Sequence, residues 1–269
     1  MKRSCYKRLI GAVSLVTWIS TTFAAFPNLG DLGEKFKKAE GTATKVGKVV
    51  KGATGLSLEE EMAVGDAVSV EIVSLYGGIW RDEAATRRIN VIGRGLARYA
   101  DRQDLIWSFG LLNSDAVNAF SAPGGRVFIT RGLYQRLDSD DKLAGALAHE
   151  IEHIDERHAL KIIARGEFLS GVTGLVSERS KDFAQFDQAI SLVTQQILEK
   201  GFDPNTEYEA DKEGRDLATT TGYAPGGLRA VLARLRADTG GSAKTVFSTH
   251  PPLDERLKRL PNDPEPSGP

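Results

Sequence analysis

The chemically most informative stretch of this sequence is His-Glu-Ile-Glu-His at positions 149–153, which has the pattern His-Glu-x-x-His. In a helix, residues four apart lie on one face, so His149 and His153 can offer two imidazole nitrogens to one ion. Neutral imidazoles suit Zn²⁺, which tolerates a distorted tetrahedron. Glu150 lies about 100° around the helix from His149, where it can take a proton from a metal-bound water. The pattern predicts a zinc-dependent hydrolase, and a peptidase before other classes, with Glu150 as general base.

The residues around this pattern favour a helix with one face for packing and another for chemistry. Ser139 is a suitable N-cap, and the two aspartates after it suit the positive end of the helix dipole. Apolar residues at helical spacing predict a buried stripe that leaves the two histidines to one side: Leu143, Leu147, Ile151 and Ile154. His158 does not fit the metzincin spacing, and we expect it to continue the stripe as a hydrogen-bonded core residue. The alternative to a metal site is two surface histidines on an ordinary helix.

A catalytic zinc ion needs a third protein ligand and one open position for water. Two downstream segments contain a Glu with an Asp four residues later, namely Glu178 with Asp182 and Glu207 with Asp211. On a helix, such a Glu can bind the metal while the Asp accepts the free ring N–H of a ligand histidine. The small residue Gly214 would let the second segment pack closely on the first helix. This favours Glu207 without excluding Glu178.

The rest of the sequence predicts an α+β, mainly helical domain with a small antiparallel sheet beside the His-Glu-x-x-His helix. Ser57 and Glu60 form a capping box that opens a helix ending near Gly77. A second helix is expected at about 82–100. Short segments rich in β-forming residues follow at 106–112, 117–121 and 126–130, with a Pro-Gly-Gly turn between the last two.

The second of these β segments is a candidate binding surface for substrate. Zinc peptidases commonly bind an extended peptide along a sheet edge beside the metal, where main-chain hydrogen bonds provide affinity with little sequence demand. We assign Asn118, Ala119 and Phe120 to this edge. A plain scaffold hairpin is the alternative interpretation of the same residues.

The N-terminal region is typical of an exported protein. Residues 1–25 combine a basic start with an apolar stretch at 9–19 that is short for a membrane span, which predicts a secretory signal peptide. An uncleaved membrane anchor is the alternative. The only cysteine, Cys5, precedes the apolar stretch, so we expect no disulfide in the mature chain. A flexible arm rich in Gly and Lys is expected at 26–56, the zinc metallopeptidase domain at 57–260, and a disordered tail at 261–269.

The formal net charge of −1 argues against a nucleic-acid partner. Export predicts the periplasm as the location, with at most peripheral contact to a membrane. Two other functions remain open: a periplasmic chaperone or assembly factor with a latent or structural zinc site, and a zinc hydrolase of peptidoglycan or another amide. The presence of Glu150 argues against a purely structural site, which needs no general base.

The motifs, taken together, resemble peptidase family M48, a group of gluzincin zinc metalloproteases that includes the CAAX prenyl endopeptidases and a heat-shock membrane protease. The resemblance covers most of 56–260, through His-Glu-Ile-Glu-His at 149–153, Glu-Tyr-Glu-Ala-Asp at 207–211, and the segments 118–125, 130–133, 221–225 and 249–252 with Arg256. It implies a zincin-like domain and one Zn²⁺ per chain. It also implies Glu207 as the third ligand, Asp211 behind a ligand histidine, and Asn118–Phe120 as the substrate edge.

Within this family the sequence is most similar to soluble periplasmic members that degrade stalled outer-membrane proteins. The similarity implies unfolded or misassembled envelope proteins as substrates, and outer-membrane assembly machinery as a partner with which the chain would associate. In such members a histidine of the Thr-His-Pro-Pro motif can occupy the open position of the zinc. His250 is therefore either a latch or a surface loop residue. Arg256 either stabilises an oxyanion or pairs with an acidic residue.

Overall fold

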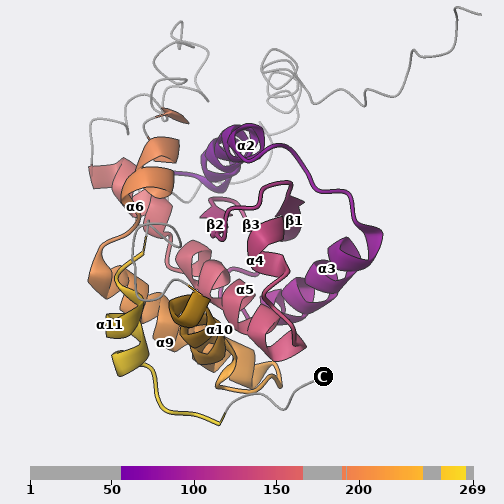
Figure 1. Cartoon of the computed structure of the whole chain (residues 1–269). Coiled ribbons are helices and arrows are strands. Elements are labelled where there is room, and N and C mark those ends of the chain that lie inside the picture. The colour runs from indigo at the N-terminus through magenta and orange to yellow at the C-terminus, as the bar shows by residue number, and fades with distance from the viewer. Residues whose placement is uncertain (1–55, 166–189, 192, 239–249, 265–269) are drawn as a thin grey trace, which may run out of the picture. The chain divides into compact units, whose positions relative to one another are not determined.

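The computed structural model of the 269-residue chain describes residues 56–165, 190–191, 193–238 and 250–264 (Figure 1). These residues belong to the unit that spans Val50–Pro269. The expected signal peptide and all but the last residue of the Gly/Lys-rich arm lie outside the described residues. The alternative pair Glu178 and Asp182 lies outside them as well.

The central element is helix α5, Asp140–Asp155, which contains the His-Glu-x-x-His pattern. Ser139 caps it as predicted, because its hydroxyl accepts a hydrogen bond from the Lys142 amide. The predicted stripe is buried, with Leu143, Leu147 and Ile151 fully inaccessible to solvent. α5 contacts the helices α3, α9 and α10 and the strand β2, so the metal-site pattern lies inside the fold rather than on a surface helix.

Three strands form a sheet between two layers of helix (Figure 1). They are β1 (Ser108–Leu112), β2 (Ala119–Ala122) and β3 (Arg126–Thr130). Alternate side chains point to opposite faces of a strand. One set packs with α3 and α5 (Phe109, Leu111, Ala119, Val127 and Ile129), and the other packs with α2 (Leu112, Phe120, Ala122 and Phe128). Burial on both faces explains why these strands are mostly apolar instead of alternating regularly with polar residues.

The sheet is mixed, and the prediction of an antiparallel sheet was wrong for one of its two pairings. β2 and β3 form the expected antiparallel hairpin, with Phe120 opposite Phe128. β1, however, pairs parallel with β3 in the order β1-β3-β2. After β1, the segment at 113–118 leads to β2, which does not pair with β1. β3 then lies between β1 and β2 and pairs with both. On its other side, β1 forms an antiparallel bridge between Leu112 and Ile79.

Two N-terminal helices support this sheet. The predicted capping box opens α2, Leu58–Leu75, through reciprocal hydrogen bonds between Ser57 and Glu60. The second predicted helix is α3, Glu83–Ala97, capped by Asp82. The buried Glu61 of α2 accepts hydrogen bonds from the Arg102 guanidinium and from the Gly124 amide. The buried ion pair ties α2 to the segment between α3 and β1, and the hydrogen bond from Gly124 ties it to the turn that joins β2 and β3.

Beyond the sheet, the described residues form the short helix α4 (Arg131–Tyr134), α6 (His158–Arg165), the π-helical turn η1 (Gln196–Lys200), α9 (Pro204–Thr220), α10 (Gly227–Asp238) and α11 (Leu253–Arg259). α5 ends before α6 because Arg157 adopts a φ of 54°. His158 therefore begins a new helix, so the prediction that it continues the α5 stripe was wrong. The prediction that it is a hydrogen-bonded core residue is confirmed. None of the helices in the described ranges has the length and apolarity that crossing a bilayer requires.

The predicted C-terminal tail begins inside the described part of the chain. Asp263 accepts hydrogen bonds from Nε and Nη2 of Arg215 at 2.6 and 3.0 Å, which holds residues near 263 against α9. The arginine holds the pKa of the Asp263 carboxyl below its usual value. Residues 265–269 lie outside the described residues.

Candidate metal centre and active site

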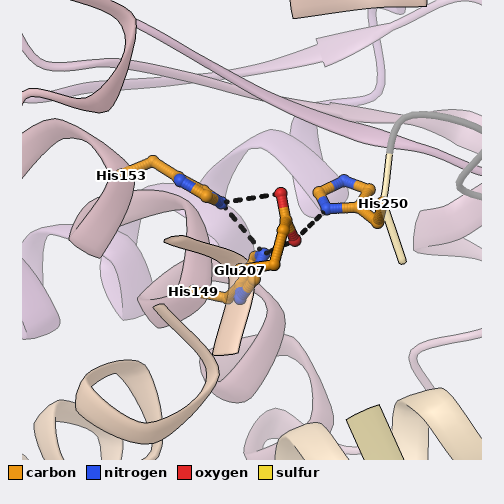
Figure 2. A group of neighbouring side chains, drawn as sticks. All are labelled: His149, His153, Glu207 and His250. Carbon is orange, nitrogen blue, oxygen red and sulfur yellow. Dashed lines mark hydrogen bonds and ion pairs between the residues drawn. The ribbon is translucent and has the colours of Figure 1, made fainter. Parts of the chain in front are cut away.

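Four side chains that could bind a metal ion converge in the core from three separate segments. His149 and His153 come from α5, Glu207 from the first turn of α9, and His250 from the segment before α11 (Figure 2). Their ligand atoms all lie within 4.8 Å of one another. The structure thus brings together the three side chains expected to bind zinc and the candidate latch.

Three of the donors are spaced as a zinc ion requires. With bonds of about 2.0–2.1 Å to the metal, the edges of a coordination tetrahedron are about 3.3 Å long. The Nε2 atoms of His149 and His153 lie 3.2 Å apart, and Glu207 oxygens lie 3.5 Å from the first and 3.6 Å from the second. In the described part of the chain, Glu207 Oε1 is also a buried oxygen without a hydrogen-bond partner. The spacing, the donor chemistry and the unsatisfied oxygen fit a zinc ion.

The position of Glu207 follows from how α9 begins and how closely it packs. Asp203 caps α9 by accepting hydrogen bonds from the Asn205 and Thr206 amides, which places Glu207 in the first turn. Further along, a Cβ added at Gly214 would lie 2.8 Å from the His149 backbone nitrogen. Only glycine permits this approach without displacement, so the predicted close contact between the two helices is confirmed.

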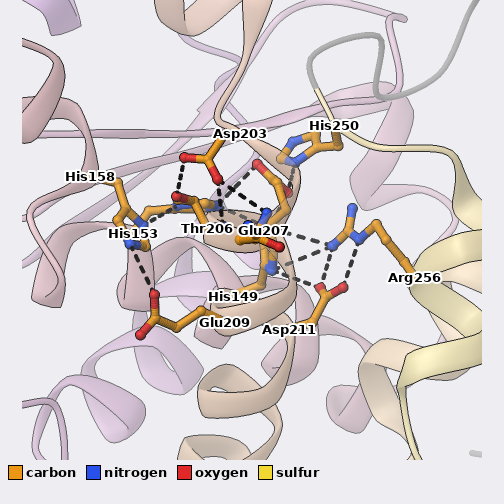
Figure 3. A network of polar contacts seen from close by, with 11 residues as sticks. His149, His153, His158, Asp203, Thr206, Glu207, Glu209, Asp211, His250 and Arg256 are labelled. Atoms are coloured by element: carbon orange, nitrogen blue, oxygen red, sulfur yellow. Dashed lines mark hydrogen bonds and ion pairs between the residues drawn. The ribbon is translucent and has the colours of Figure 1, made fainter.

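Asp211, one turn beyond Glu207, lies behind the first histidine as expected. Its Oδ1 lies 3.1 Å from His149 Nδ1, which leaves Nε2 facing the other donors (Figure 3). A carboxylate at Nδ1 fixes the tautomer and ring orientation of a metal-binding histidine. Arg256 donates hydrogen bonds to both oxygens of Asp211, at 2.9 Å from Nε and 2.5 Å from Nη2. Of the two expectations for Arg256, the structure contains the pairing with an acidic residue.

The electrostatics of the cluster reflect its burial and its carboxylates. Burial and Arg256 lower the pKa of His149, but Asp211 and Glu207 outweigh both and raise it to about 9. For His153, burial dominates and the pKa falls well below its usual value. Burial raises the pKa of Glu207, but His250 and His149 outweigh it and hold the carboxyl well below its usual pKa. The cluster therefore contains an ionised carboxylate beside imidazoles in a buried site, an arrangement that a divalent cation would satisfy.

Glu150 lies on α5 beside the cluster but outside the group of metal-binding donors. It is buried, and burial raises the pKa of its carboxyl, although His149 and His250 oppose this shift. A hydrogen bond with Ser121 of β2 also opposes it. This contact joins the expected general base to the strand on which a peptide is expected to bind.

The candidate substrate residues lie at the edge of the sheet. β2 hydrogen-bonds to β3 alone among the described strands, so its second edge has no strand partner in that part of the chain. Asn118 precedes β2 and is fixed by hydrogen bonds with Thr130, while Ala119 and Phe120 are its first two residues. All three are buried, and β2 contacts both α2 and α5.

His250 lies against Glu207 and not on an exposed loop. Its Nδ1 contacts Glu207 Oε2, and its side chain is 5% exposed. Its ring centroid is 5.5 Å from that of His149. Four protein donors would fill all four positions of a tetrahedral zinc ion and leave none for water.

A sequence profile of peptidase family M48 matches residues 83–263, which is more than half of the chain. The chain belongs to peptidase family M48. The resemblance inferred from the motifs is therefore confirmed, and so is the mainly helical α+β fold. Members of a metallopeptidase family require a metal, and the four-donor cluster of this M48 chain is where the structure offers a place for one.

Curated relatives of this M48 chain carry protease names. The beta-barrel assembly-enhancing protease of Yersinia pestis is 29% identical over 222 residues, 78% of this chain and 45% of the relative. The protein of that name in Escherichia coli (strain K12) is 26% identical over 252 residues, 89% and 50% of the two chains. The mitochondrial metalloendopeptidase OMA1 of Schizosaccharomyces pombe is 26% identical over 209 residues, 76% and 61%. These names agree with the predicted enzyme class, a zinc metalloendopeptidase.

The chain spans about half the length of the first two relatives, at 45% and 50%.

Three contacts of the M48 site were not anticipated from the sequence. Ser121 contacts Glu150, Phe202 stacks on His153 with ring centroids 4.4 Å apart, and His158 contacts the same ring from another side. Ser121 lies within the motif segment 118–125, but neither that motif nor any other indicates these three contacts, because each arises through tertiary packing.

Proposed function

We propose that this protein is a zinc-dependent endopeptidase of the cell envelope that cleaves unfolded or misassembled proteins. The observation that carries the proposal is the buried group of His149, His153 and Glu207, spaced for one zinc ion, with Glu150 beside it. Membership of family M48 supports the same reaction class.

Each residue of the site has a part in the proposed reaction. A zinc ion held by His149, His153 and Glu207 would lower the pKa of a coordinated water towards about 7 and polarise the scissile carbonyl. Glu150 accepts the proton of the attacking water and donates it to the leaving amine. The burial that raises the pKa of Glu150 strengthens it as a base. Asp211, held by Arg256, keeps His149 Nε2 directed at the metal position.

We further propose that the substrate binds as an extended strand on the second edge of β2. Such binding uses main-chain hydrogen bonds and makes little demand on side chains, which suits unfolded proteins of varied sequence. It would bring a peptide next to Ser121 and hence next to Glu150. Because Ala119–Ala122 are buried, the peptide must displace the groups that cover this edge.

The envelope location is proposed from two sources. The N-terminal 25 residues are typical of a secretory signal. Two relatives are named for enhancing β-barrel assembly, which supports a partner in outer-membrane assembly. The same names support misassembled envelope proteins as substrates of this chain.

The function is tested by incubating the purified chain with β-casein, which is unfolded, and with a tightly folded protein as control. We expect casein fragments in the presence of zinc, no fragments after 1,10-phenanthroline, and recovery when stoichiometric zinc is restored. The physical reason is that the reaction requires the ion to lower the pKa of water and polarise the carbonyl. The measurement is fragment formation over time by mass spectrometry.

The same assay separates the peptidase from its main rival, a chaperone or assembly factor with a latent or structural zinc site. A chaperone would bind casein or suppress its aggregation while leaving it intact. Intact casein at every zinc concentration, with a folded and zinc-loaded protein, would contradict the peptidase proposal. A hydrolase of peptidoglycan would instead release amide products from purified cell wall.

We propose that His250 holds the protein in a latent form by occupying the fourth position of the zinc. In the wild type, only the fraction of molecules in which His250 has left the zinc could cleave casein. His250→Ala should therefore increase the cleavage rate by the inverse of that fraction, about tenfold if it is one in ten. The matched control is Glu255→Ala, an exposed residue of α11 that pairs with Lys258. Initial rates at saturating zinc are the measurement. Unchanged or reduced cleavage by a folded His250→Ala protein would argue against the latch.

A further inference from the structure

We propose that His158 is a positioning residue for the metal ligand His153, and that Glu209 is its outer partner. The inference rests on the proposed metal site. It assigns to three residues a row of polar side chains, Glu209–His158–His153, that ends at the metal position. The row is visible on one side of the network in Figure 3.

The first link is the contact between the two imidazoles. Nδ1 of His153 lies 2.8 Å from Nδ1 of His158, and both rings are buried. If His153 binds the metal through Nε2, that nitrogen carries no proton, so Nδ1 of the neutral ring must carry one. The N–H then donates to His158 Nδ1. This hydrogen bond fixes the tautomer that His153 needs as a ligand.

The second link follows from the tautomer of His158. Since its Nδ1 accepts, the neutral ring must carry its proton at Nε2. In the described part of the chain, His158 Nε2 is a buried side-chain nitrogen without a hydrogen-bond partner. The nearest carboxylate oxygen that it meets is Oε2 of Glu209, at 3.9 Å. The Glu209 side chain is half exposed, so it can rotate the remaining distance and accept this proton.

The local backbone places His158 for this role. α5 ends at Asp155, and the φ of 54° at Arg157 turns the chain so that the first residue of α6 faces back toward His153. A positive φ is unfavourable for a non-glycine residue and persists only where the surroundings enforce it. Phe202 stacks on His153 at an interplanar angle of 22° and closes the other side of the ring. His153 is thus held by stacking and by one directed hydrogen bond.

The arrangement parallels the one at the other histidine. His149 has Asp211 at Nδ1, and His153 has His158 at Nδ1, so each presents Nε2 to the metal position. The partners differ in chemistry, because Asp211 offers a carboxylate oxygen and His158 offers an imidazole nitrogen. Glu209 gives this second row its own terminal carboxylate. The sequence motif Glu-Tyr-Glu-Ala-Asp at 207–211 thereby places three carboxylates on α9, one beside the metal position and one behind each histidine.

The competing interpretation is that His158 only fills space beneath His153. Two substitutions separate the roles. His158→Gln keeps a side-chain oxygen that can accept from His153 Nδ1–H, whereas His158→Leu keeps apolar volume and removes the acceptor. If His158 only fills space, leucine should serve as well as glutamine or better.

The experiment measures zinc affinity of the full chain by competition with a chromophoric chelator, and the visible absorption of the Co²⁺-substituted protein. We expect His158→Leu to weaken zinc binding by about 10–100-fold, the usual cost of losing an outer partner of a ligand histidine. It should also alter the Co²⁺ absorption, while His158→Gln restores most of the affinity. Glu209→Ala should weaken zinc binding, and Glu213→Ala, one turn further on α9 and paired with Lys212, should not.

A His158→Leu protein that is folded by circular dichroism and binds zinc and Co²⁺ like the wild type would overturn the inference. So would equal losses in the leucine and glutamine variants, because these would indicate a packing role. Wild-type protein that binds no zinc would contradict the proposed function itself. The two failures are therefore distinguishable without any measurement of proteolysis.

Discussion

Glu150→Gln should leave zinc bound and reduce casein cleavage by about 10²–10⁴-fold, the usual contribution of a positioned general acid–base group. The amide has the shape of the carboxyl but cannot accept the proton of the attacking water. Glu150 is not among the four converging donors, so its replacement should not remove the ion. It is buried, and burial is the main cause of its raised carboxyl pKa. A neutral amide at this position should therefore be tolerated by the fold.

The matched control for this variant is Glu152→Gln, the same substitution two residues later on α5. Burial and the neighbouring carboxylates Asp155 and Glu213 raise the pKa of Glu152 to about 8, so an uncharged amide resembles the state it already has near neutrality. Glu152→Gln should keep both zinc and cleavage. Metal content by plasma mass spectrometry and initial cleavage rates are the two measurements. Wild-type cleavage by the Glu150 variant would remove it from the mechanism.

Glu207→Ala should lose the zinc ion, with an affinity loss greater than the 10–100-fold that an outer partner costs. The substitution removes the only carboxylate of the four-donor group, so no anion of that group remains beside the two histidine Nε2 atoms, which lie 3.2 Å apart. His250 also loses its contact with Glu207 Oε2. Casein cleavage should disappear with the metal. The measurements are zinc content after gel filtration and chelator competition, with circular dichroism to establish folding.

The control for Glu207 is Glu178→Ala, which removes the corresponding residue of the other Glu/Asp pair in the sequence. We expect this variant to keep one zinc per chain and wild-type cleavage. The opposite pattern, with zinc retained by Glu207→Ala and lost by Glu178→Ala, would mean that the third ligand is Glu178. Loss of zinc in neither variant would mean that the ion is held elsewhere. Either result would remove the basis of the proposed mechanism.

The sequence by itself determined the features that depend on residues close together in the chain. The capping box at Ser57, the cap at Ser139 and the hairpin of β2 and β3 were each predicted and found. So was the helix that places His149 and His153 on one face. Helix periodicity, capping and turn formation involve hydrogen bonds and steric preferences within a few residues. They can therefore be inferred before any tertiary contact is known.

The tertiary structure decided what residues far apart do together. Spacing left Glu178 and Glu207 open as ligands, and packing across Gly214 brings Glu207 to the histidines. The parallel pairing of β1 with β3, and the turn at Arg157 that directs His158 to His153, have no local signature. The reason is that the free energy gained by burying apolar side chains depends on contacts throughout the core. It therefore favours one packing arrangement of the helices and strands over the others. That selection, more than any single motif, assembles the four donors into a site.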